Sequence, residues 1–549
     1  MGNSFLTVGN AVKSLLPNGT RGGGSWDEPP EWPPDLFAVS ASIVDKYDTY
    51  PMFLDEESPL AEIKLPATLS SLQEIAKGWA QEDKEQPAVA DLWSTIYDAF
   101  HLEVSEASSN SSWLTAIHKL LIIGDEASAG IGFFSKSGSW IRRYYQYLNS
   151  EVSDIRLTKN QRPSCCIHVP NEVACVQPKT RTPMIGCTTR SLSHHLALLP
   201  PSSSVHVSWH PTDSINELND SADVFNILTI PFPYCVPASS AKAILGDDEI
   251  APGYGKFEFE QTWIEGKEVD LVDHVANLYR QALRDVPTLD AIVLPEMALN
   301  ETAYNALEQE FLKPEYSGLQ ALISGVKTDE GNRNSAFTTY FDESREGNRG
   351  IWRGAQHKHH RWKLDKSQIS AYSLGSALSP SRDWWENINV TDRSVHFYVF
   401  RRGACFTTLV CEDLARVDPC QTIIRAVGPN LVFALLMDGP QLRDRWPGRY
   451  AMTLADDPGS SVLSLTSLGL MRRSSYLFRS RECVALWRDS QGETNEIEIP
   501  AGAHGLLISL SRETHEEFTL DGRGDGGSAY SWTLTGSTSV VNSHCKLDE

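Results

Sequence analysis

The chain has 549 residues, of which 41% are hydrophobic and 22% charged, and its formal net charge at pH 7 is -23. A chain of this length ordinarily folds into about two to four domains, because single cores stop growing at roughly 250–300 residues. No segment approaches the ~18 consecutive apolar residues that a membrane span needs. The negative net charge disfavours contact with a phosphate backbone. From these two observations we expect neither membrane insertion nor direct nucleic-acid binding.

The ten cysteines are too sparse for a disulfide scaffold. Residues 1–16 lack the charged, apolar and small-residue regions of a secretory signal, so we predict a cytoplasmic protein with reduced thiols. One stretch gathers thiols and an imidazole, the ligands that zinc prefers: Cys165, Cys166, His168, Cys175 and Cys187. Their spacing fits no paired CxxC pattern, and we predict no metal and no cofactor.

The N-terminal third divides into two regions. Glycine and proline crowd residues 1–35, which predicts a flexible leader. Residues 36–220 show helical periodicity, with amphipathic segments at 88–104, 113–124 and 140–155. We therefore predict an α-rich accessory domain that ends in a polar stretch at 211–223. This region carries no recognisable chemistry, and a protein partner could bind through it.

From residue 224 the pattern changes to alternating strands and helices. Apolar, β-branched runs predict strands at 225–231, 291–294, 319–326, 336–341, 395–400, 404–410 and 430–437. Three later runs continue the pattern, at 462–468, 483–487 and 506–510, and amphipathic spacing predicts a helix at 268–283. Strands separated by helices indicate a layered α/β domain over residues 221–512. Residues 513–549 are polar and rich in glycine and serine, which predicts a loose tail.

Cys411 stands at the end of the second strand of a predicted hairpin. Glu412 and Asp413 follow it, as acidic residues do in the first turn of a helix. A thiol between a strand end and a helix N-terminus is expected to have a lowered pKa and a larger thiolate fraction. The alternative is a buried structural cysteine, since free cysteines are among the most buried residues.

Two other stretches supply groups that would complement a nucleophilic thiol. Glu296 follows the strand at 291–294, and burial at a strand end raises the pKa of a carboxylate toward the range useful for proton transfer. The basic run at 356–366, which includes Lys358, offers cations that can stabilise an oxyanion. Taken singly, Glu296 is more often a helix-capping or solvated carboxylate, and such a basic run is usually a solvated face or an anion patch.

The chain order of these groups resembles the carbon-nitrogen hydrolase (nitrilase) superfamily over about residues 223–510. The resemblance implies a four-layer αββα sandwich and a glutamate, a lysine and a cysteine acting together. Carried over, Glu296 would be the general base, Lys358 would hold the tetrahedral intermediate and Cys411 would be the nucleophile. The Asn-Ser-Ala run at 334–336 and the strand at 429–437 resemble the strands that precede the lysine and follow the cysteine.

The sequence departs from the family pattern at three places. Lys363 is a second candidate for the lysine. Family members often use a further glutamate shortly after the lysine, and Asp365 is the nearest acidic residue, with a shorter side chain. The usual Arg-Ala-x-Glu-Asn element is matched only in part by the Arg-Ser-Arg-Glu-Cys run at 479–483, which leaves the pocket and the dimer contact open.

The resemblance implies a homo-oligomeric hydrolase that cleaves a non-peptide carbon-nitrogen bond of a small amide or nitrile through a thioester. The alternative is a catalytically altered module that acts as a binding or effector component of a larger intracellular assembly. The altered-catalysis reading arises because no second glutamate matches the family pattern. The effector reading arises because the lysine stretch, with Trp352 and Trp362, is similar to nitrilase modules attached to reverse transcriptases in defence systems.

Overall fold

The computed structural model describes residues 7–55, 57–58, 60–82, 85–104, 111–133, 164–183, 185–201, 205–210, 223–244, 254–343, 349–474 and 481–547. The helix predicted at 140–155 lies outside the described residues, as do residues 211–222 of the expected domain boundary.

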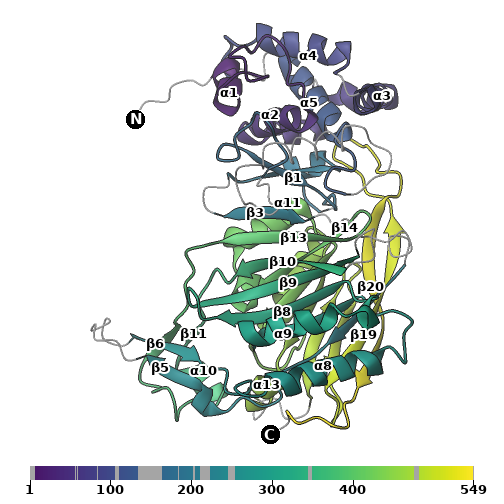
Figure 1. Ribbon diagram of the computed structural model, residues 1–549. Helices are drawn as coiled ribbons and strands as arrows, with labels where there is room; N and C mark the ends of the chain where they lie inside the picture. The colour runs from purple at the N-terminus through teal and green to yellow at the C-terminus, as the bar shows by residue number, and fades with distance from the viewer. Residues whose placement is uncertain are drawn as a thin grey trace.

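The N-terminal part is a helical layer, at the top of Figure 1. Its α-helices are α1 (Val8–Leu15), α2 (Pro33–Lys46), α3 (Pro66–Glu82), α4 (Pro87–Asp98) and α5 (Ser111–Glu126). They share one apolar core with the small hairpin of β1 (Cys175–Pro178) and β2 (Leu196–Leu199). The helices predicted at 88–104 and 113–124 are therefore confirmed as α4 and α5. No helix in the described ranges is long and apolar enough to cross a membrane.

Below this layer, two seven-stranded sheets face each other. The first has the order β10-β9-β8-β7-β4-β19-β20. Its strands are β4 (Val224–Thr229), β7 (Ala291–Asn300), β8 (Ala321–Thr328), β9 (Arg333–Glu343), β10 (Arg349–His357), β19 (Gly505–His515) and β20 (Ala529–Val540). Its centre, β4-β7-β8, is parallel, and the remaining neighbours are antiparallel.

The second sheet has the order β18-β17-β16-β15-β14-β13-β3. Its strands are β3 (His206–His210), β13 (Ser394–Arg401), β14 (Ala404–Val410), β15 (Leu431–Leu436), β16 (Ser461–Thr466), β17 (Cys483–Arg488) and β18 (Thr494–Glu498). Strands β14, β15 and β16 run parallel. Strands β13 and β14 form the predicted antiparallel hairpin, so the strands predicted at 395–410 and 430–437 are confirmed.

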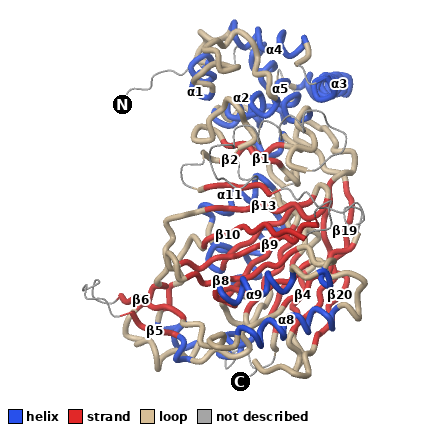
Figure 2. The backbone as a smooth tube through the Cα atoms, in the orientation of Figure 1, coloured by secondary structure: helices blue, strands red, loops and turns tan. Residues whose placement is uncertain are grey.

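The two sheets pack face to face, and helices cover their outer faces. Strand β7 contacts β15 and β16, and the ring of Tyr340 in the first sheet stacks on Phe406 in the second at 6.2 Å between centroids. Helices α8 (Glu268–Ala282) and α9 (Glu301–Phe311) lie across the first sheet, as Figure 2 shows, and α12 (Trp446–Asp456) packs on the second. The predicted four-layer αββα sandwich is therefore confirmed.

Three segments differ from the expected organisation. The leader contains helix α1, because Thr7 caps its N-terminus and Val8 and Val12 are buried against the helical core. Strand β3 comes from the expected accessory domain but pairs with β13 of the second sheet. The expected polar tail contains β20, which pairs with β19 along its length. Trp532 of β20 is fully buried. Its neighbours in the sequence are mostly serines and threonines, so the sequence did not indicate that this strand has a buried face.

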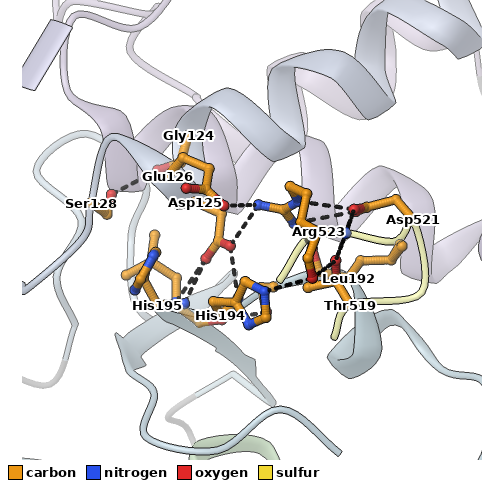
Figure 3. Close-up of polar contacts among 12 residues, drawn as sticks. Gly124, Asp125, Glu126, Ser128, Leu192, His194, His195, Thr519, Asp521 and Arg523 are labelled. Carbon is orange, nitrogen blue, oxygen red and sulfur yellow. Dashed lines mark hydrogen bonds and ion pairs between the residues drawn. The ribbon is translucent and has the colours of Figure 1, made fainter. Parts of the chain in front are cut away.

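A buried arginine joins the helical layer to the C-terminal segment (Figure 3). The guanidinium of Arg523 pairs with Asp521 at 2.9 Å, with Asp125 at 3.3 Å and with Glu126 at 2.5 Å. Asp125, in α5, also accepts hydrogen bonds from the backbone N–H groups of residues 194–196. Because these partners come from three distant parts of the sequence, the cluster fixes the helical layer against the sandwich.

We expect Arg523→Met to lower the free energy of unfolding by about 3–5 kcal/mol, because removing one partner leaves the buried carboxylates uncompensated. Urea unfolding measures the change. The matched control is Arg280→Met, whose side chain and that of its partner Glu315 are 51% and 57% exposed. The control should lose no more than about 1 kcal/mol. Equal losses of unfolding free energy in the two variants would contradict the stabilising role of the Arg523 cluster.

Candidate active site

The three residues predicted to act together come from both sheets. Glu296 lies within β7, and Lys358 directly follows β10, both in the first sheet. Cys411 directly follows β14 in the second sheet. The backbone N–H of Lys358 donates to the carbonyl of Asn334 at 2.8 Å, which fixes where its side chain begins. Facing sheets thus bring side chains from distant parts of the chain to one place.

Lys358 forms the centre of the site. Its Nζ lies 2.8 Å from Glu296 Oε1 and 2.7 Å from Glu386 Oε2. Asn334 Nδ2 donates to Glu296 Oε1 at 2.8 Å and to Glu386 Oε1 at 3.0 Å. Lys358 and Glu296 are only 1% and 2% exposed. One buried ammonium and one amide therefore hold two carboxylates together.

Glu386 is the second carboxylate, which the sequence analysis missed. It ends β12 (Asp383–Glu386) of a small four-stranded sheet, and its Oε2 also accepts from the backbone N–H of Trp362 at 3.0 Å. The available signal was an acidic residue at the end of an aromatic strand, in Trp-Trp-Glu. This is the same kind of position as that of Glu296 after its apolar run.

The alternatives near the lysine lie elsewhere. Asp365 was the nearest candidate for the second carboxylate, but it is the N-cap of α10 (Lys366–Ala371) and accepts from the backbone N–H of Gln368 at 2.8 Å. Lys363 pairs with Asp383 at 2.7 Å, and its side chain is 41% exposed. Lys358 is therefore the lysine that contacts Glu296.

The partial match to the Arg-Ala-x-Glu-Asn element also lies away from this network. Arg481 pairs with Glu498 at 2.5 Å, and Glu482 pairs with Arg472 at 2.9 Å, all with partly exposed side chains. Cys483 begins β17. Residues 479–480 are outside the described part of the chain.

An irregularity in β7 positions Glu296. The pairing of β7 with β8 shifts register between Leu294 and Leu299, and Met297 has a positive φ of 58°. Strand β8 approaches this irregularity so closely that a Cβ on Gly325 would lie 2.4 Å from Glu296 Cα. Only glycine fits there. Such irregularities redirect a side chain, which here brings the Glu296 carboxylate to Lys358.

Cys411 occupies a strained turn. Its φ is 46°, a left-handed conformation that is uncommon for a residue with a side chain. The turn at Cys411–Ala415 is a 3-10 helix, so the α-helix expected to follow the cysteine directly is absent; α11 (Thr422–Val427) comes later. Within the turn, Asp413 accepts hydrogen bonds from the backbone N–H groups of His359 and His360. This contact fastens the cysteine turn to the lysine segment.

The protonation states follow from burial. Burial raises the pKa of the Cys411 thiol well above its ordinary value, and the negative charge of Glu296 adds to the effect, while Lys358 opposes it. The prediction of a lowered thiol pKa is therefore wrong. Burial also raises the pKa of Glu296, with Lys358 opposing and Glu386 adding to the rise. Burial disfavours the Lys358 ammonium, but the two carboxylates outweigh it and raise its pKa well above the ordinary value.

We expect Glu296→Gln to lower the pKa of Cys411, because the substitution removes a negative charge that disfavours the thiolate. The measurement is the rate of iodoacetamide labelling at Cys411 as a function of pH, followed by peptide mass. Its midpoint should move to lower pH. Glu482→Gln removes a carboxylate of 40% exposure that pairs with Arg472, and it should leave the midpoint unchanged. A midpoint that rises in Glu296→Gln would refute this electrostatic picture.

No protein-family model and no curated protein matches the chain. Among solved structures, it is similar to Nit3 of Saccharomyces cerevisiae, a member of branch 10 of the nitrilase superfamily, at 11% identity, with 52% of this chain and 89% of that chain covered and a TM-score of 0.29. It is also similar to an amidase from Nesterenkonia sp. (11%, 52% and 90%, TM-score 0.30) and to a carbon-nitrogen hydrolase from Helicobacter pylori (13%, 52% and 89%, TM-score 0.30).

The chain resembles nitrilase-superfamily structures over about half of its length. Identities of 11–13% and TM-scores of 0.29–0.30 carry no argument about activity.

Proposed function

We propose that this protein is a thiol-dependent hydrolase of a non-peptide carbon-nitrogen bond in a small-molecule amide or nitrile. The observation that supports this most directly is the Lys358 ammonium between Glu296 and Glu386, close enough to Cys411 for its charge to act on the thiol. A base and a cation in one buried network, with a nucleophile near enough to be affected by both charges, are the parts that acyl transfer through a thioester needs.

The first half of the reaction forms the thioester. Glu296 takes the proton from Cys411, and the sulfur attacks the carbonyl carbon of the amide. The negative charge on the carbonyl oxygen is stabilised by the Lys358 ammonium. The carbon-nitrogen bond then breaks, and the nitrogen leaves as an amine or ammonia with the proton that Glu296 carried.

The second half restores the enzyme. Glu296 removes a proton from water, the hydroxide oxygen attacks the thioester carbon, and the carbon-sulfur bond breaks. Sulfur regains a proton, and a carboxylic acid is released. A nitrile would follow the same route through a thioimidate, which water converts to a thioester with loss of ammonia. Glu386 keeps Lys358 charged and in place throughout.

The raised pKa values suit these roles. A buried thiol with a raised pKa stays protonated and requires a base, and a carboxylate with a raised pKa is a better base than an ordinary one. Positioned general acid-base catalysis typically contributes roughly 10²–10⁴ in rate, and one oxyanion donor is worth on the order of 10²–10³.

The same proposal places the protein in a reducing compartment such as the cytoplasm. All ten cysteines lie in the described ranges, and none of them forms a disulfide. A reducing environment keeps a cysteine nucleophile in the thiol form that this chemistry requires.

We expect Cys411→Ala to abolish turnover without unfolding the protein, because a small buried side chain is replaced by one of similar size. Intact-mass spectrometry after incubation with a cell metabolite extract should detect an acyl adduct on the wild type and none on the variant. Cys405→Ala is the matched control, since Cys405 is a fully buried cysteine on β14, the strand that Cys411 directly follows. An adduct that persists in Cys411→Ala, or unchanged turnover, would eliminate this mechanism.

We expect Glu386→Gln to move the acidic limb of the kcat/KM profile to lower pH. The negative charge of Glu386 raises the pKa of Glu296, so removing it lowers that pKa and leaves the base ionised in more acidic solution. The midpoint of the profile on any hydrolysed amide measures the effect. Asp365→Asn keeps a good N-cap and lies outside the network, so its midpoint should match that of the wild type.

A further inference from the structure

Asp438 lies at the same edge of the second sheet as Cys411. Strand β15, which ends two residues before Asp438, pairs in parallel with β14, and Val410 is opposite Leu435. Parallel strands end at the same edge, so residues that follow them emerge side by side. Asp438 is close enough for its negative charge to act on the Cys411 thiol. The mechanism described above does not use this carboxylate.

Two neighbours fix the orientation of the Asp438 carboxylate. Its Oδ1 accepts hydrogen bonds from the hydroxyl of Tyr372 and from Arg445 Nη2, the latter at 2.9 Å. Its backbone N–H donates to Thr466 Oγ1 at 3.0 Å, and that hydroxyl donates back to the Asp438 carbonyl at 2.7 Å. With the backbone and Oδ1 both held, the carboxylate cannot rotate freely, so the direction of Oδ2 is set.

The other oxygen, Oδ2, is buried and has no hydrogen-bond partner among the described residues. Asp438 as a whole is 3% exposed. Leaving a buried carboxylate oxygen unpaired is unfavourable, so such an atom needs an explanation. Arg445 already balances the charge of Asp438. The partner that Oδ2 lacks is therefore a hydrogen-bond donor and need not be a cation.

We propose that Asp438 is a substrate-binding residue whose Oδ2 accepts a hydrogen bond from an N–H group of the substrate. The substrate class is then amides that retain an N–H, rather than nitriles or esters, which carry none at the reacting group. This inference rests on the proposed function and narrows it, since the Cys411 chemistry alone accommodates both amides and nitriles. A site built to bond an N–H discriminates strongly against analogues that lack it.

The test uses two probes with the same acyl group and the same chromophore. p-Nitroacetanilide presents an N–H, and p-nitrophenyl acetate has oxygen at that position. In Asp438→Asn, the side-chain oxygen is still needed by Tyr372 and Arg445, so the amide N–H₂ faces the substrate donor. We expect kcat/KM for the anilide to fall about 10- to 100-fold. The kcat/KM value for the ester should change by less than about 3-fold. The measured quantity is therefore the ratio of kcat/KM for the anilide to kcat/KM for the ester, which should fall.

Two further variants serve as a control for the substitution and as a second test of Asp438. Asp223→Asn changes an aspartate whose side chain is 71% exposed, and it should leave the ratio unchanged. Tyr372→Phe removes one of the two donors that orient Asp438 while keeping the carboxylate, and it should lower the ratio by a smaller factor. If Asp438→Asn melts at a much lower temperature than the wild type, the ratio in Tyr372→Phe decides.

The outcomes separate this inference from the function on which it rests. A ratio that stays constant in both Asp438→Asn and Tyr372→Phe, or a wild type that cleaves the ester but not the anilide, overturns the role of Asp438 and leaves the thiol mechanism intact. A wild type in which neither probe acetylates Cys411, as judged by intact mass, contradicts the proposed function and the inference together.

Discussion

The structure of the site depends on one buried ammonium shared by two carboxylates. Desolvation lowers the pKa of Lys358, and the adjacent Glu296 and Glu386 outweigh this effect and raise that pKa. These three residues come from β7, from the segment after β10 and from the end of β12. Asn334 donates to both carboxylates and closes the network. Removing Lys358 would leave two buried carboxylates uncompensated, so the arrangement depends on this ammonium.

The buried charges of Lys358, Glu296 and Glu386 also affect the protonation of the Cys411 thiol. In a solvated turn at a helix N-terminus, a cysteine acquires a lowered pKa and carries its own negative charge. Cys411 is instead buried beside a carboxylate, which holds it as the neutral thiol. The resting site then avoids a third negative charge near Glu296 and Glu386. In the proposed mechanism, activation is coupled to Glu296, whose raised pKa suits it to accept the thiol proton. In that mechanism the thiolate forms only as Glu296 takes up the proton.

Buried carboxylates that accept several backbone N–H groups recur throughout the fold. Asp35 in α2 accepts from residues 167–169, Asp125 in α5 accepts from residues 194–196, and Asp413 accepts from residues 359–360. Each one fastens a loop that would otherwise leave backbone donors unpaired in a buried position. Asp413 applies this device between the cysteine turn and the lysine segment. The same physical solution therefore supports both the helical layer and the site.

Apolar, β-branched runs such as 291–294 and 404–410 predicted the strands that flank the site, because such runs indicate burial directly. Such runs also predicted strands before Glu296 and Cys411, whereas β10, the strand that Lys358 follows, was not predicted from the sequence. Only the tertiary structure identified Glu386 in place of Asp365, separated Lys358 from Lys363 and reversed the expected pKa shift of Cys411. It also showed that the segment predicted to be a polar tail contains strand β20, which pairs with β19. The physical reason is that partner choice, desolvation and edge-strand pairing depend on groups far apart along the chain, whose proximity local sequence patterns do not encode.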